Sequence, residues 1–130
     1  MTSEELLNRF AELTEGLLFP SETDAPLEPY RWTDGEPSPD IVRAELDVPV
    51  STPIQMLSAE ELFAPLLAPE EDGGAPPEEA ARYREMLALL REHLTDVQVH
   101  LVGRYDVQVL LLGRHPSGEW LGLRTRIVET

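Results

Sequence analysis

Residues 97–130 read VQVHLVGRYDVQVLLLGRHPSGEWLGLRTRIVET, and this stretch decides the fold. Apolar and polar residues alternate over 97–101 and again over 120–128, and a β-branched and leucine-rich run fills 107–112. Residues 115–118, HPSG, have the composition of a tight turn. The pattern predicts three strands in an antiparallel meander whose last strand runs to the end of the chain.

Helical signals precede this meander. A capping box opens the first helix at Thr2, and Gly16 ends it. Further helices are expected at about 39–46, 59–67 and 78–94, each after a cap or proline signal, and the last has apolar residues at spacings of three and four.

The remaining segments are shorter. Residues 17–19 and 28–33 are expected to form two strands joined by an acidic loop, and 68–77, rich in Gly and Pro, should be a mobile connection. With 130 residues, the chain has the length of one domain, so a single α+β domain over 1–130 is predicted.

Charge is distributed unevenly along the chain. Residues 1–80 contain 19 Asp and Glu against three Arg, whereas residues 81–130 contain six acids and seven Arg. The net negative charge of the chain, −15, excludes free nucleic acid and anionic membranes as partners and favours a basic protein. Because large apolar residues such as Phe19, Trp32 and Phe63 lie within the acidic part, we expect a folded domain with an acidic face rather than a disordered tail.

The residues that usually carry chemistry are sparse. The chain has no cysteine, and its histidines, His93, His100 and His115, show no catalytic or metal-ligand spacing. Paired acids begin helices, where the helix dipole favours them. The sequence therefore predicts no enzyme and no cofactor. The N-terminus resembles neither a signal peptide nor a membrane span, and a cytoplasmic location is expected.

Two short segments carry a resemblance to a known family. Residues 16–22, GLLFPSE, follow the first expected helix, and residues 127–130, IVET, end the meander. Trp32 after the acidic loop, the long helix and the glycines of the meander lie in matching order between them. In these features, over essentially its whole length, the chain resembles the cyanobacterial nuclease A inhibitors and their bacterial relatives.

The resemblance implies a fold, a partner and contact residues. The fold would be an α/β/α sandwich with a largely antiparallel sheet and helices on both faces. The partner would be a basic, magnesium-dependent, sugar-non-specific nuclease of the ββα-metal type, bound by a monomer in a 1:1 complex. Glu22 has the position of the carboxylate that enters the nuclease's arginine cluster, and Thr130 that of the residue that reaches the catalytic magnesium. Carboxylates bind guanidinium bidentately, and magnesium accepts hard oxygen ligands.

Four further acids are predicted to add to this partner-binding surface: Asp24, Glu71, Asp72 and Glu129. One feature departs from the family pattern. The family has an acid beside a Trp in the loop before the long helix, whereas residues 70–74 read EEDGG and include no aromatic residue. Aromatic anchors often carry much of an interface's binding energy, so this difference bears on the identity of the target.

Other interpretations remain open for the same residues. Glu22 is also explained as a loop or cap carboxylate, and Thr130 as the end of a strand. The chain as a whole is also compatible with a non-inhibitory module that binds another basic protein. A third interpretation is a metal-dependent enzyme built on clustered carboxylates.

Overall fold

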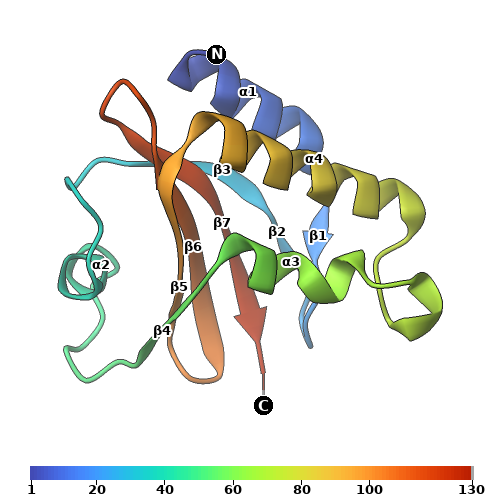
Figure 1. Cartoon of the computed structure of the whole chain (residues 1–130). Coiled ribbons are helices and arrows are strands. Elements are labelled where there is room, and N and C mark those ends of the chain that lie inside the picture. Colours follow the sequence, from blue (N-terminus) through green and yellow to red (C-terminus); the bar gives the residue numbers. More distant parts are fainter. Residues whose placement is uncertain (130) are drawn as a thin grey trace.

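A five-stranded antiparallel sheet forms the centre of the molecule, in the order β3-β7-β6-β5-β4 (Figure 1). The computed structural model describes residues 1–129. The strands are β3 (Glu28–Trp32), β4 (Ile54–Leu57), β5 (Thr95–Val102), β6 (Asp106–Arg114) and β7 (Trp120–Val128). The predicted meander is confirmed, because β5 pairs with β6 and β6 pairs with β7 in antiparallel register. The predicted extent of its last strand was wrong, because β7 ends at Val128 and Glu129 lies beyond it.

A second, two-stranded sheet lies beside this one. It consists of β1 (Leu18–Phe19) and β2 (Ala25–Pro26), paired antiparallel. Strands were expected around β1 and β3, but β1 hydrogen-bonds to β2 rather than to β3. Strands β2 and β4 were not predicted, because they are too short to show a clear alternation pattern.

All four predicted helices are confirmed: α1 (Ser3–Thr14), α2 (Pro39–Glu45), α3 (Ala59–Leu67) and α4 (Pro77–His93). Capping boxes open α1 at Thr2 and α3 at Ser58, and the side chain of Ser38 caps α2. Gly16, just beyond α1, has a φ of 71°, which a residue with a side chain adopts at a cost. The chain therefore turns sharply from α1 into β1.

Helices cover both faces of the sheet, as the resemblance implied. On one face α1, α3 and α4 bury a core that includes Phe10, Phe63 and Tyr83. On the other face, Val42 of α2 lies in a second core with Trp32. Figure 1 shows α2 apart from the other three helices, across the sheet from them.

The connection between α3 and α4 contains more structure than expected. A 3-10 turn, η1 (Glu70–Asp72), occupies its middle. The amide of Gly74 donates to the carbonyl of Pro69 at 3.1 Å, and the amide of Ala75 donates to that of Leu66 at 2.9 Å. A Cβ at Gly74 would collide with the carbonyl oxygen of Ala68, so glycine is required there. The segment predicted as a mobile connection thus has a defined, hydrogen-bonded backbone.

Candidate functional site

The loop between β1 and β2 is a compact turn built by its own side chains. The carboxylate of Asp24 accepts a hydrogen bond from the amide of Ser21 at 3.2 Å, and the Ser21 hydroxyl donates to the carbonyl of Thr23 at 2.8 Å. Ser and Asp commonly organise turns in this way, because their short polar side chains reach nearby backbone groups. Glu22 lies at the centre of this turn and is exposed.

The same loop is attached to the end of β7. The amide of Glu22 donates to the carbonyl of Val128 at 3.2 Å, and the amide of Val128 donates to the Ser21 hydroxyl at 3.1 Å. One residue further, the amide of Glu129 donates to the carbonyl of Tyr105 at 2.7 Å. The C-terminal strand is therefore held between the acidic loop and the β5–β6 hairpin.

Three of the predicted site residues come together through these bonds. Glu22 and Asp24 share the turn, and Glu129 directly follows the residue to which the turn is hydrogen-bonded. Thr130, the other principal prediction, lies outside the described residues. Segments from the two ends of the sequence thus meet at one edge of the molecule.

An apolar groove of about 480 Å³ opens beside the loop. Its walls come from β1, α3 and the strands β4, β5 and β7. Glu22 and Glu129 both line it, so the two acids border one concave surface.

Glu71 and Asp72 lie at the margin of this region. Both are exposed in η1, and Gly73, the next residue, lines the groove. Within the part of the chain that the structure describes, neither acid itself lines the groove. The structure therefore brings η1 close to the loop of Glu22 without placing either of its side chains in the groove.

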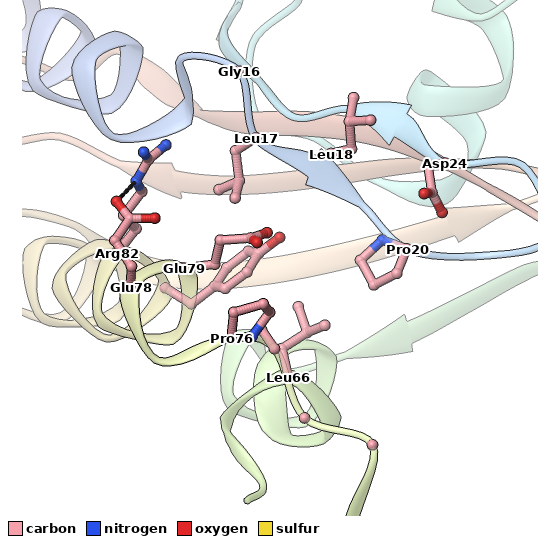
Figure 2. A pocket seen from close by; sticks show the side chains of 14 residues that line it. Gly16, Leu17, Leu18, Pro20, Asp24, Leu66, Pro76, Glu78, Glu79 and Arg82 are labelled. Carbon is pink, nitrogen blue, oxygen red and sulfur yellow. Dashed lines mark hydrogen bonds and ion pairs between the residues drawn. The ribbon is translucent and has the colours of Figure 1, made fainter. Parts of the chain in front are cut away.

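A second hollow, of about 500 Å³, is also lined by Pro20 (Figure 2). Glu79 and an ion pair between Glu78 and Arg82, at 2.8 Å, lie along α4 on one side of it, and Asp24 lies across from them. Pro20 also lines the groove beside Glu22, as do Leu66 and Gly73. The acidic loop thus contributes residues to both hollows.

Tyr83 of α4 also borders the second hollow. Its side chain is 1% exposed, and its hydroxyl has no hydrogen-bond partner among the described residues. Burial raises the pKa of Tyr83 to about 12, so the phenol is neutral at physiological pH.

Arginine pairs offset the acidic charge elsewhere on the molecule. The Arg124 guanidinium lies 3.2 Å from the carboxylate of Glu28, and that of Arg91 lies 2.9 Å from Glu60. No arginine is among the described residues that line the groove. The negative field is therefore less compensated around the groove than along these arginine pairs.

The described residues contain no cluster suited to a metal ion. Among residues 1–129 no group of three or more His, Asp and Glu is arranged to hold a metal ion. His100 is fully buried, and His115 contacts Ser117 at 2.9 Å and the carbonyl of Met1 at 3.0 Å. His100 therefore belongs to the core, and His115 to a hydrogen-bonded turn near the N-terminus. None of the helices described is both long enough and apolar enough to cross a membrane.

Two participants in the site were missed by the sequence analysis. Ser21 joins the loop to β7, and Tyr105 accepts the bond from Glu129 through its backbone carbonyl. The sequence contains a signal for the role of Ser21, because Ser21 and Asp24 have the spacing of a turn that is closed by a side chain. A backbone acceptor such as Tyr105 leaves no trace in the sequence.

These features define an α+β domain in which an acidic loop is hydrogen-bonded to the end of the last strand and borders an apolar groove. The chain belongs to the nuclease A inhibitor-like family, because the sequence model described as nuclease A inhibitor-like protein matches residues 4–130. No curated protein matches the chain. Membership of this family indicates a non-catalytic role as a nuclease inhibitor, with a nuclease as its binding partner.

Proposed function

We propose that this protein inhibits a magnesium-dependent, sugar-non-specific nuclease of the ββα-metal type by occluding its active site. One monomer binds one enzyme molecule. Glu22 enters the arginine cluster that normally contacts the phosphate, and Thr130 reaches the catalytic magnesium of the partner. Asp24, Glu71, Asp72 and Glu129 add negative field around these two contacts.

The observation that carries this proposal is the attachment of the Glu22 loop to Val128. Two hydrogen bonds join the loop to the strand that leads to the C-terminus: the Glu22 amide donates to the Val128 carbonyl at 3.2 Å, and the Val128 amide donates to the Ser21 hydroxyl at 3.1 Å. A phosphate mimic and a terminal metal ligand can serve one active site only if they are presented together. A pre-formed turn also lowers the entropy lost on binding.

The chemistry of the two groups matches the proposed roles. A carboxylate replaces a phosphate because it forms paired, charge-assisted hydrogen bonds with guanidinium. Magnesium accepts oxygen ligands, which a hydroxyl or a terminal carboxylate supplies. Glu22 is exposed, so the free protein presents it without unfolding the loop.

An activity titration tests the proposal. A nuclease of this type encoded in the same genome is mixed with increasing amounts of the protein, and cleavage of DNA and of RNA is followed separately. Both activities should fall to the background level near one equivalent. Undiminished cleavage with the protein in excess would contradict the proposal.

The absence of an aromatic residue from residues 70–74 favours a second candidate. A module with this fold would then bind a different basic protein without inhibiting a nuclease. Affinity capture from the source organism, with and without magnesium, separates the two candidates. The inhibitor retains a nuclease, whereas the module retains a basic protein without nuclease activity.

A further inference from the structure

We infer that the apolar groove beside Glu22 receives an aliphatic or aromatic side chain of the partner, on a segment that also carries arginine or lysine. This inference rests on the proposed function and extends it, because it assigns to the partner the anchor residue that this chain does not present in residues 70–74.

The groove offers apolar surface that the fold itself leaves uncovered. Leu57 of β4, Leu101 of β5 and Ile127 of β7 all line it, and all three are only partly buried against the main core. Pro65 of α3 is exposed at its edge. Covering partly exposed aliphatic groups with an apolar side chain is favourable in proportion to the area removed from water.

The charged rim determines what can accompany that side chain. Within the described residues, every charged side chain that lines the groove is acidic: Glu22, Glu61 and Glu129. Glu61 accepts the amide hydrogen bond of Ser58 at 3.2 Å in its capping box, which fixes the position of its carboxylate. A partner segment that carries arginine or lysine on either side of the anchor complements this acidic lining, whereas a segment with acidic side chains would be repelled by it.

The size of the groove fits this occupant. At about 480 Å³ it has room for one large side chain together with the backbone next to it. It also adjoins the Glu22 turn, so one partner surface can contact both. An anchor held in a well-packed pocket, with surrounding contacts that exclude water, is the usual arrangement of a binding hot spot.

Three variants of α3 test the occupancy of the groove. Pro65→Trp places a bulky ring over the groove, Pro65→Ala removes the proline without filling it, and Ala64→Trp places the same ring on an exposed residue that does not line the groove. Affinity for the nuclease is measured by calorimetry, after circular dichroism has checked folding. Pro65→Trp should weaken binding by about tenfold or more, while the two controls remain within about threefold of the wild type. Unchanged affinity of folded Pro65→Trp would overturn the inference.

A peptide titration tests the groove without the nuclease. Acetyl-Arg-Phe-Arg-amide is added at millimolar concentration to the wild-type protein, with acetyl-Glu-Phe-Glu-amide as the control. Methyl resonances of Leu57, Leu101 and Ile127 should shift with the basic peptide only. Absence of shifts, equal shifts with both peptides, or shifts that arise from protein concentration alone and so indicate a second copy, would overturn the inference.

The two experiments distinguish this inference from the proposed function. If the nuclease is not inhibited but the basic peptide shifts the three methyl groups, the proposed function fails and the chemistry assigned to the groove stands. If the nuclease is inhibited but the peptide and Pro65→Trp have no effect, the groove assignment fails and the inhibitor role stands.

Discussion

The backbone amide of Glu22 donates a hydrogen bond of 3.2 Å to the carbonyl oxygen of Val128. This bond joins the acidic loop after β1 to the last strand of the sheet. It fixes the position of the Glu22 backbone relative to that of Glu129, and both residues line the same groove. The geometry of the candidate site therefore depends on a contact between the two ends of the sequence.

Ser21→Ala should loosen this attachment. The Ser21 hydroxyl accepts from Val128 at 3.1 Å and donates to Thr23 at 2.8 Å, and each net hydrogen bond contributes about 0.5–1.5 kcal/mol. Because both bonds are lost, the free energy of unfolding should fall by about 1–3 kcal/mol in urea titrations, and nuclease affinity should fall with it. Thr23→Ala is the matched control, because Thr23 contributes its carbonyl group to the turn. Equal effects of the two substitutions would argue against a role for the Ser21 side chain.

Glu22→Ala should weaken nuclease binding by about 2–5 kcal/mol if the carboxylate is buried against arginines in the complex. Glu36→Ala removes an exposed carboxylate from the connection before α2 and serves as the control for net charge. Inhibition constants of the wild type and the two variants, measured at one salt concentration, give the loss of binding free energy for each substitution. A loss smaller than about 0.5 kcal/mol for Glu22→Ala would exclude the phosphate-mimic role, since surface charges commonly contribute this little.

Association with a basic nuclease should slow steeply as salt increases. The chain carries a formal net charge of −15, and opposite charges steer encounter over distances that salt screens. Stopped-flow measurements at several ionic strengths should show a large fall in the association rate and a smaller change in the dissociation rate. An association rate independent of salt would indicate that the acidic half does not face the partner during encounter.

Sequence patterns predicted the regular elements and failed at the short ones. The spacing of Leu87, Leu90 and Leu94 indicated α4 because a helix periodically returns side chains to one face. By contrast, β2 has two residues and exists only through its pairing with β1. A pattern needs several repeats before it can be recognised, and such strands provide none.

Stability should depend on pH through His100. Its side chain is fully buried, its ring nitrogens have no hydrogen-bond partner among the described residues, and burial lowers its pKa from 6.5. Below pH 6.5 the unfolded chain therefore binds a proton that the folded protein does not bind. The free energy of unfolding should fall by up to about 1.4 kcal/mol per pH unit as pH decreases through this range.

His100→Leu isolates this contribution. Leucine removes the titrating group and its two unpaired nitrogens from the core. Urea titrations at about pH 7.5, 6.5 and 5.5 should show a smaller loss of stability for the variant than for the wild type. Because His93 and His115 are present in both proteins, the difference reports on His100. Identical pH slopes would contradict this assignment.

The candidate site was predicted in part, for a physical reason. Glu22, Asp24 and Glu129 were selected from a resemblance and from charge, and the structure places their backbones together. The groove was not foreseen, because it forms where Leu57, Leu101 and Ile127 meet from three strands. Sequence separation hides such a surface, and its apolar residues follow the same pattern as core residues.

The dependence of inhibition on substrate concentration tests the central claim most directly. If Glu22 and Thr130 occupy the active site of the nuclease, the protein and DNA compete for the same groups. The apparent inhibition constant of the wild-type protein should therefore increase in proportion to DNA concentration above KM. An inhibition constant that does not change with DNA concentration, or a nuclease that is not inhibited, would contradict the account.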